Sequence, residues 1–274
     1  MAIARVGISG WRYPPWRGEW YPKDLPQRRE LEYSSSRLSS IELNGSFYSL
    51  QRPQNYLDWY AETPPGFVFS VKGGRFITHL KRLNDIEIPL ANFFASGVLA
   101  LRDKLGPILW QLPERHAFDA EQLEAFFAKL PRTTSQALAL ARKHDARLDG
   151  REWLEGQPES PMLHALEARH PEFIGDSVAG LLRANGIAFV IADTAGKWPQ
   201  NRTVTSDFVY VRLHGAEELY ASGYTDSALD TWAADIRGWL EDGRDVYVYF
   251  DNDMKVRAPF DAVALASRLG IEWG

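Results

Sequence analysis

The chain has 274 residues, a formal net charge of −5 and 45% hydrophobic residues. This length is close to the about 250 residues typical of one eight-stranded α/β barrel. The absence of cysteine excludes disulfides, thiolate metal ligands and cysteine nucleophiles. We see no signal peptide and no membrane span, so we expect a cytoplasmic protein with no membrane partner. The acidic balance argues against a surface coated with phosphate-binding side chains, although it allows one local basic site.

Eight short apolar runs follow one another along the chain, and each stops at a polar or charged residue. They begin near residues 5, 40, 67, 107, 163, 187, 207 and 245. Helix-compatible stretches lie between most of them, at 53–61, 90–105, 120–130, 177–184, 225–240 and 259–269. This alternation predicts βαβ units and a parallel sheet, and eight units favour closure into a barrel. We therefore expect one domain, a TIM-type (β/α)8 barrel over residues 1–274. An open doubly wound sheet is the alternative, but no glycine-rich phosphate turn follows the first run.

Two connections depart from an even eightfold pattern. Between the fourth and fifth runs, residues 113–162 form a long insertion with a second helix near 134–143 and a polar segment at 145–160. Between the sixth and seventh runs, residues 194–206 are too few for a full helix and contain Pro199.

Alternation along each strand separates the side chains that face the barrel axis from those that face the helices. In the second run, for example, Ile41 and Leu43 oppose Glu42 and Asn44. The polar parity through all eight runs gives Ser9, Trp11, Glu42, Asn44, Lys72, Gln111, Glu167, Arg169, Asp193, Arg212, His214 and Asp251. Because a parallel barrel gathers the carboxyl ends of its strands at one mouth, we predict a single site there. The near balance of cations and anions in this set also fits an interior ion-pair network.

The polar set contains the groups that acid–base chemistry and anion binding need. Our catalytic candidates are Glu42, Glu167, His170, Asp193 and His214. The candidates for binding an anion or another part of the substrate are Lys72, Arg169, Arg212, Asn44, Gln111 and Asn252.

A metal site has no spacing signature in this chain. There is no H-E-x-x-H motif and no His-x-His pair, yet the five catalytic candidates also form an N/O ligand set suited to zinc or manganese. The metal ligands are therefore unknown. No cofactor is strongly implied, and a divalent metal is compatible with the set. We assign no role to the other histidines, which are His79, His116, His144 and His164.

Aromatic residues and prolines are interleaved just after the first run. The rings there are Trp11, Tyr13, Trp16, Trp20 and Tyr21. Trp11 and Tyr13, with Tyr48 after the second run, are our candidates for stacking on a base or sugar ring. The alternative is a loop that packs its own small core. Ser9 and Ser46 lie in no G-x-S-x-G elbow, so we do not expect acyl transfer.

Seven segments in order resemble a known family. They are residues 7–18 (GISGWRYPPWRG), 41–48 (IELNGSFY), 67–72 (FVFSVK), 104–113 (KLGPILWQLP), 167–170 (EARH), 210–215 (YVRLHG) and 249–252 (YFDN). They resemble the YecE-like family of uncharacterised proteins, domain of unknown function seventy-two, from residue 5 to about 266. The resemblance implies a TIM barrel similar to the endonuclease IV and xylose isomerase group, without implying a reaction. Two departures are Gly45-Ser46, where the family usually has Ser-Thr, and Asp251, where it usually has Asn.

Three hypotheses follow for the function. The leading one is a hydrolase that acts on a phosphate-bearing or nucleic-acid-like substrate at the barrel mouth. The second is a glycosidase or other sugar-directed enzyme that uses paired carboxylates. The third is a noncatalytic module that binds single-stranded nucleic acid. The expected partner is a small-molecule or nucleic-acid-like substrate, and no protein partner is indicated.

Overall fold

The structure is a computed structural model that describes residues 1–198 and 200–271. Pro199 of the predicted short connection and residues 272–274 of the predicted domain lie outside the described residues.

The described residues contain nine strands where the sequence predicted eight. The predicted sixth run is divided in two at Val190, which belongs to neither β6 nor β7, and the amide of neighbouring Phe189 donates to Thr205 Oγ1 (2.8 Å). The strands are β1 (Ala4–Ser9), β2 (Ser40–Leu43), β3 (Val68–Lys72), β4 (Leu105–Gln111), β5 (His164–Glu167), β6 (Ala188–Phe189), β7 (Ile191–Asp193), β8 (Phe208–Leu213) and β9 (Asp245–Phe250).

Helices occupy most of the connections, and several begin at a side-chain cap. Asp119, Thr133 and Thr225 each accept the amide of the residue three positions on, which stabilises the first turn of α5, α6 and α8. The α-helices are α1 (Glu30–Ser35), α2 (Gly45–Tyr48), α3 (Pro53–Glu62), α4 (Glu87–Ala95), α5 (Ala120–Phe127), α6 (Thr134–Ala141), α7 (Asp176–Ala184), α8 (Asp226–Glu241) and α9 (Ala258–Arg268). The other helical turns are η1 (Pro14–Trp16), η2 (Gln27–Arg29), the π-helix η3 (Phe76–Leu80), η4 (Val98–Lys104) and η5 (Ala146–Leu148).

The chain divides into two compact units. The first comprises Met1–Glu42, Thr63–Val68 and Ala188–Gly274, and the second comprises Leu43–Glu62 and Phe69–Ile187. The predicted single domain over residues 1–274 stays a prediction.

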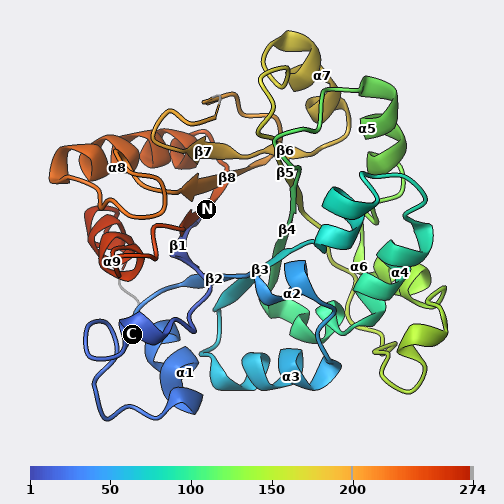
Figure 1. The fold of residues 1–274 in the computed structure, drawn as a ribbon, viewed down its shortest axis with the longest axis horizontal. Coiled ribbons are helices and arrows are strands. Elements are labelled where there is room, and N and C mark those ends of the chain that lie inside the picture. The colour runs from blue at the N-terminus through green and yellow to red at the C-terminus, as the bar shows by residue number, and fades with distance from the viewer. Residues whose placement is uncertain (199, 272–274) are drawn as a thin grey trace. The chain divides into compact units, whose positions relative to one another are not determined.

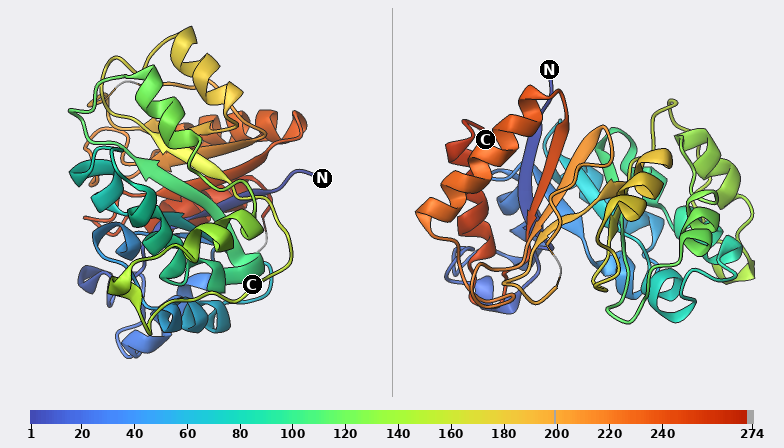
Figure 2. Two further views of the ribbon diagram at one scale, coloured as in Figure 1. Left: turned by 90° about the vertical axis from the view of Figure 1, so that its right-hand side faces the viewer. Right: turned by 90° about the horizontal axis from the view of Figure 1, so that it is seen from above.

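In the first unit, five strands lie in the order β2-β1-β9-β8-β7, and their pairings are parallel. Helices α8 and α9 pack against each other and against β9, and α9 also packs against β1. Figure 1 labels these elements, and the right-hand view of Figure 2 shows α8 running alongside the strands of this unit. Because these strands are parallel, the carboxyl ends of β1, β2, β8 and β9 point in the same direction and lie next to one another.

In the second unit, β3, β4 and β5 lie side by side and are also parallel. Helix α4 packs against α6, and both contact η4 (Figure 1). Fully buried Trp110 of β4 donates from Nε1 to Nδ1 of His164 (3.2 Å), whose other ring nitrogen lies 2.8 Å from the carbonyl of Pro131. His164 is therefore a core residue, and burial lowers its pKa to about 4.

The two irregular connections have the following structures. Between β4 and β5 lie α5, α6 and η5. Between β7 and β8, residues 194–198 and 200–207 contain no helix. All the strand pairings given above are parallel, as expected for βαβ units.

One glycine allows an unusually close approach of two strands. A Cβ placed on Gly7 of β1 would lie 1.9 Å from the carbonyl oxygen of Ser40 in β2. No side chain fits at that distance, so position 7 requires glycine.

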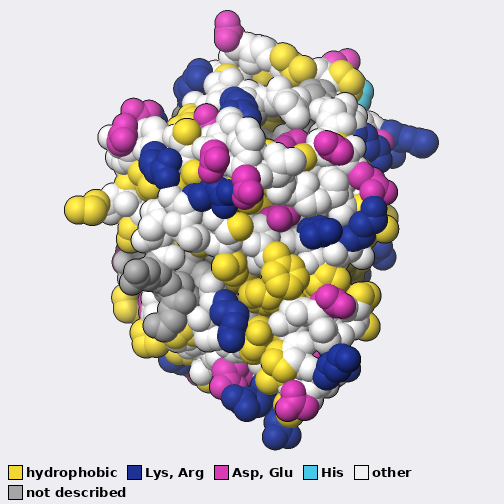
Figure 3. Space-filling model, turned by 90° about the vertical axis from the view of Figure 1, so that its left-hand side faces the viewer, with side chains coloured by type: hydrophobic (Ala, Val, Ile, Leu, Met, Phe, Trp, Pro, Cys, Tyr) yellow, Lys and Arg dark blue, Asp and Glu magenta, His cyan; other side chains and the backbone are white. Residues whose placement is uncertain are grey.

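Charges of both signs share the surface. Figure 3 shows one face of the molecule, on which Lys or Arg side chains and Asp or Glu side chains are interspersed around apolar groups. Exposed pairs of this kind include Arg268 with Asp226 and Asp230, and Lys255 with Glu218. No helix in the described part of the chain has the length and apolar character needed to cross a bilayer.

Candidate functional site

A buried ion pair occupies the strand ends of the first unit. Glu42 of β2 and Arg212 of β8 are both 0% exposed. Arg212 donates from Nε to Oε2 of Glu42 (3.0 Å) and from Nη2 to Oε1 of Glu42 (2.8 Å), so the guanidinium binds both carboxylate oxygens. This bidentate geometry is the strongest form of a charge-assisted hydrogen bond.

Two hydroxyl groups complete the surroundings of Glu42. Ser9 Oγ donates to Oε1 of Glu42 and accepts from Arg212 Nη2 (3.1 Å). Tyr210 Oη donates to Oε2 of Glu42 (2.6 Å). Each oxygen of Glu42 thus accepts two hydrogen bonds, an arrangement that suits holding Arg212 in place better than exchanging protons with a substrate.

Asp251 and His214 extend this network. Arg212 Nη2 donates to Asp251 Oδ2 (3.0 Å), and Nδ1 of His214 lies 2.9 Å from the same oxygen. Arg212 Nη1 lies 3.4 Å from His214 Nε2. We call Ser9, Glu42, Tyr210, Arg212, His214 and Asp251 the glutamate–arginine cluster.

A protonatable carboxyl lies beside this cluster. The pKa of Asp253 is raised to about 6, first by burial and then by the negative charge of Asp251. The ring of Tyr13 packs against Trp16 at 4.7 Å between centroids, and its hydroxyl donates to the carbonyl of Ser9 (2.5 Å). Because its pKa is about 6, Asp253 still holds a proton between about pH 4 and pH 6, where an ordinary aspartate is ionised.

Asn252 belongs to a neighbouring buried network. Its Nδ2 donates to Asp261 Oδ2 (2.8 Å) and to the carbonyl of Ser222 (2.9 Å). Its Oδ1 is buried and accepts no hydrogen bond within the described residues. Asp261 Oδ2 also accepts the amide of Tyr224 (3.2 Å). Asn252 thus ties the turn after β9 to α9, which is a structural role.

Asp193 ends β7 and is partly buried. Burial raises the pKa of its carboxyl, and a hydrogen bond from Tyr224 partly opposes that shift. Gln200 Nε2 donates to its Oδ1 (3.4 Å), and the amide of His214 donates to its carbonyl (2.9 Å).

In the second unit, Lys72 ends β3 and is buried against aromatic rings. Its Nζ lies 4.6 Å from the centroid of Phe47. The ring of Phe47 packs edge-on against His79 of the π-helix η3 (5.1 Å), and Nδ1 of His79 lies 2.9 Å from Thr78 Oγ1. Lys72 and His79 therefore both contact the same phenyl ring.

Several positive charges surround His79. The pKa of its imidazole is lowered to about 4, first by burial and then by Lys72, Arg169, Arg75 and His116. We call Lys72, Arg75, His79 and Arg169 the cationic cluster. Because η3 is a π-helix, a form that recurs at functional sites, the position of His79 depends on an irregular turn.

Glu167 is the last residue of β5, and Arg169 and His170 lie on the segment that follows it. Arg169 Nε donates to Glu167 Oε1 (2.9 Å), and Glu167 is 2% exposed. His170 is partly exposed, and its Nδ1 lies 3.7 Å from Glu172 Oε2. Glu167 thus orients Arg169, and His170 stands next to it with access to solvent.

Two amide side chains of the second unit lie at strand ends. Gln111 is buried at the end of β4. Asn44 precedes α2, and its Oδ1 is buried and accepts no hydrogen bond from the described residues. Both remain candidates for contacting a substrate.

The aromatic residues after β1 pack mainly on one another. Trp16 and Tyr21 are almost fully buried, and Trp20 packs edge-on against Tyr21 at 6.5 Å. Trp11 is also buried, at 7% exposure. Tyr48 differs, since it is 67% exposed and Arg75 lies 5.7 Å above its ring. Tyr48 is therefore the stacking candidate that solvent reaches most freely.

The question of a metal was left open by the sequence. Within residues 1–198 and 200–271, no group of three or more His, Asp or Glu side chains is gathered closely enough to hold a metal ion.

Four residues of these sites lay outside the sequence candidates: Tyr210, Arg75, His79 and Asp253. Asp253 lies past the end of β9, in a turn that strand parity does not describe. Arg75 and His79 lie just before and within a five-residue π-helix, where neither helical nor strand periodicity applies. The available signal was the density of basic residues in 72–82, which contains Lys72, Arg75, His79, Lys81 and Arg82.

Comparison with solved structures shows the fold class. Over 98% of this chain and 99% of the other, the structure superposes on a DUF72 family protein from Thermotoga maritima with a TM-score of 0.79 at 24% sequence identity. A more distant likeness, with a TM-score of 0.52 at 9% identity over 98% and 99% of the two chains, is to D-psicose 3-epimerase of Clostridium cellulolyticum H10 with D-tagatose. Together with the parallel strands, these likenesses confirm the predicted TIM-type α/β barrel.

Comparison of sequences identifies the family. The model described as "Protein of unknown function DUF72" matches residues 5–274, so the chain belongs to this family. The UPF0759 protein YunF of Bacillus subtilis is 23% identical over 299 residues, which cover 98% of this chain and 95% of that protein. The resemblance predicted from the seven sequence segments is thereby confirmed.

Proposed function

We propose that the protein is a hydrolase that acts on a phosphate-bearing substrate, and that the cationic cluster binds the phosphate. The observation that carries the proposal is that Lys72 Nζ (4.6 Å) and the ring of His79 (5.1 Å) both pack against Phe47, while Arg75 lies 5.7 Å from the ring of neighbouring Tyr48. The charges of Lys72, Arg169 and Arg75 also contribute to lowering the pKa of His79. Lys72 and Arg75 add positive charge to this segment, Arg169 keeps guanidinium donors beyond its bond to Glu167, and a guanidinium can donate two parallel hydrogen bonds to phosphate oxygens. Since the pKa of His79 is about 4, its ring is neutral at pH 7 and offers a hydrogen bond without a further charge.

His170 is the group that we assign to proton transfer in this site. It is partly exposed beside Arg169, and an imidazole nitrogen can accept a proton from water. The water oxygen forms a bond to phosphorus, the bond between phosphorus and the ester oxygen breaks, and the leaving alcohol takes a proton from solvent. Glu167 holds Arg169 through the 2.9 Å hydrogen bond and is a positioning residue.

Calorimetric titration with inorganic phosphate and a phosphate-release assay over monoesters and diesters test this proposal. Lys72→Met and Arg169→Met should each weaken phosphate binding about tenfold or more, which corresponds to about 1.4 kcal/mol. The matched controls are Lys143→Met and Arg142→Met, two exposed residues near the end of α6 that should bind as the wild type does. A wild-type protein that binds no phosphate, or cluster variants that bind it as tightly as the controls, would rule the proposal out.

A sugar-directed enzyme is the second candidate, and Asp253 favours it. Asp253 has a pKa of about 6 and lies near a second carboxyl group, that of Asp251. A pair of this kind lets one carboxyl group donate a proton while the other stays ionised. The fold likeness to D-psicose 3-epimerase adds only that such a barrel can carry sugar chemistry. With a panel of aryl glycosides, Asp253→Asn should abolish turnover and exposed Asp207→Asn should not. Absence of turnover by the wild type across the panel would eliminate this candidate.

Binding of single-stranded nucleic acid stays a prediction, and its signature is a steep loss of affinity with salt. We place the proposed reaction in the cytoplasm, because a chain without cysteine fits a reducing compartment. Cell fractionation with an antibody to the native protein tests that location.

A further inference from the structure

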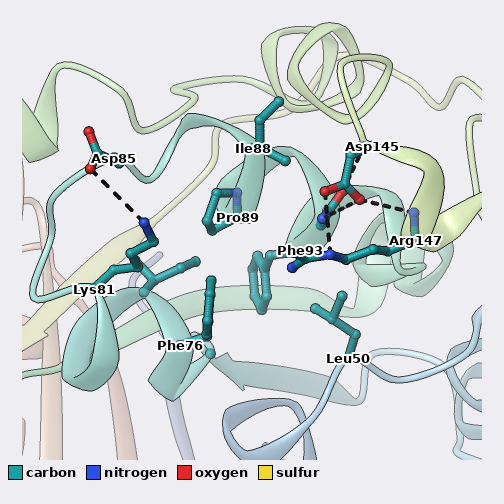
Figure 4. Close-up of a pocket in the computed structure, with 12 residues that line it drawn as sticks. Leu50, Phe76, Lys81, Asp85, Ile88, Pro89, Phe93, Asp145 and Arg147 are labelled. Atoms are coloured by element: carbon teal, nitrogen blue, oxygen red, sulfur yellow. Dashed lines mark hydrogen bonds and ion pairs between the residues drawn. The ribbon is translucent and has the colours of Figure 1, made fainter.

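A cavity of about 320 Å³ lies in the second unit beside η3 (Figure 4). This volume is that of a small organic ligand and far above that of one water molecule. The residues that line it are Leu50, Gly74, Phe76, Ile77, Lys81, Asp85, Ile88, Pro89, Asn92, Phe93, Asp145 and Arg147.

The middle of the cavity is apolar and aromatic. Phe93 and Ile77 are buried, whereas Phe76, Leu50 and Ile88 are 40–43% exposed. In Figure 4, Phe76 and Phe93 project into the same space below Pro89. Buried residues thus form a fixed floor, and partly exposed apolar side chains stand around it, which suits a flat ring that stacks or packs edge-on.

Polar groups lie at both ends of this apolar middle. Lys81 Nζ and Asp85 Oδ2 are 4.0 Å apart at one end. At the other end, Asp145 Oδ1 accepts from Asn92 Nδ2 (3.1 Å), and Arg147 reaches from there towards Phe93. These groups can hydrogen-bond heteroatoms on the edge of a ring.

The cavity and the cationic cluster share one short segment. Gly74, Phe76 and Ile77 line the cavity. Lys72, Arg75 and His79 of the same eight residues belong to the cationic cluster. Arg75 lies between the lining residues Gly74 and Phe76 in the chain, so at least one cation of the cluster stands next to the cavity wall.

From this arrangement, we infer that the substrate is a phosphate ester with a planar aromatic ring, such as a nucleoside phosphate. The phosphate lies at the cationic cluster and the ring enters the cavity against Phe76 and Phe93. This inference rests on the proposed function and adds the organic part of the substrate to it.

Four probes at one ionic strength separate the phosphate contribution from the ring contribution. They are inorganic phosphate, ribose 5-phosphate, phenyl phosphate and adenosine 5′-monophosphate, each titrated calorimetrically into the full-length protein. The two ring-bearing esters should bind about tenfold or more tighter than the two probes without an aromatic ring, a difference of about 1.4 kcal/mol. Phe76→Ala should remove this advantage and leave the affinity for inorganic phosphate unchanged. Leu80→Ala is the matched control, because Leu80 is 66% exposed on the same π-helix and does not line the cavity.

The outcomes distinguish this inference from the function on which it rests. If inorganic phosphate binds through Lys72 and Arg169 but the ring brings no gain, the inference fails and the proposed function stands. If none of the four probes binds, the proposed function fails and the inference fails with it. If adenosine, titrated as a fifth probe, binds through Phe76 as tightly as adenosine 5′-monophosphate does, the phosphate adds nothing, the cavity is a separate site and the inference is overturned.

Discussion

Arg212 donates to both carboxylate oxygens of Glu42, at 3.0 and 2.8 Å, across 170 positions of sequence. Neither side chain is exposed to solvent. Two charges removed from water must each find a partner, because an isolated buried charge is strongly destabilising.

Removing the charge of Glu42 should therefore cost much of the stability of the fold. Glu42→Gln leaves Arg212 with Asp251 as its carboxylate in this cluster, and we expect the free energy of unfolding to fall by about 3–5 kcal/mol. Urea denaturation at pH 7 measures it. Glu218→Gln, which breaks the exposed pair with Lys255, is the control and should leave the midpoint unchanged. Equal losses in the two variants would contradict this account of Glu42.

Asp253 should lower the free energy of unfolding as the pH rises from about 4 to about 6. Its pKa is raised from 3.8 to about 6, so between these values the folded chain binds a proton that the unfolded chain has released. The stability from this group is therefore complete below about pH 4 and is lost as the pH rises to about 6. Asp253→Asn should be more stable than the wild type at pH 7 and equal to it at pH 4. Urea denaturation at both values tests this, and Asp207→Asn should show no such difference between the two values.

His79 should report the charge of the cationic cluster. Nuclear magnetic resonance should show its imidazole titrating near pH 4, because burial and then Lys72, Arg169, Arg75 and His116 disfavour the protonated ring. Since the unfolded pKa is near 6.5, this group's contribution to stability is lost as the pH falls from about 6.5 towards 4. Lys72→Met, or saturation with inorganic phosphate, should raise the pKa of His79. An unchanged titration in both experiments would show that these charges do not act on the ring.

Two glycine substitutions should change the free energy of unfolding in opposite directions. Gly7→Ala places a methyl group against the backbone of Ser40, which cannot move without separating β1 from β2, and should destabilise by about 3 kcal/mol. Gly238→Ala in the last turn of α8 meets nothing within 4 Å and should stabilise by about 0.5–1 kcal/mol. Thermal unfolding of the two variants measures both, and a stable Gly7→Ala protein would refute the close approach.

The sequence predicted those parts of the site that follow from strand alternation. A period of two was enough to assign Glu42, Arg212 and His214 to one face, and the structure brings these three together. It was not enough to show that Arg212 binds Glu42 and Asp251, because the partner of a charge is set by how the strands lie in space. Asp253 and His79 were missed because a turn and a single π-helical turn have no period to detect.

The sixth apolar run predicts one strand, and the structure divides it into β6 and β7. The apolar run at 187–191 is continuous in sequence, but Val190 belongs to neither strand, and the amide of Phe189 bonds the side chain of Thr205. Hydrophobic patterning records which residues are buried and does not record where a ladder of backbone hydrogen bonds is interrupted.

The buried pair also selects how the strands align during folding. Ser9 lies opposite Glu42 between β1 and β2, and Arg212 reaches them from β8, past β9. If β2 slipped by one residue, Glu42 would turn to the opposite face of the sheet and Arg212 would lose its bidentate partner. Apolar side chains tolerate such slips more easily, because one branched residue can replace another. A misaligned intermediate would thus carry a buried charge without its bidentate partner, and it would reopen rather than persist as a kinetic trap.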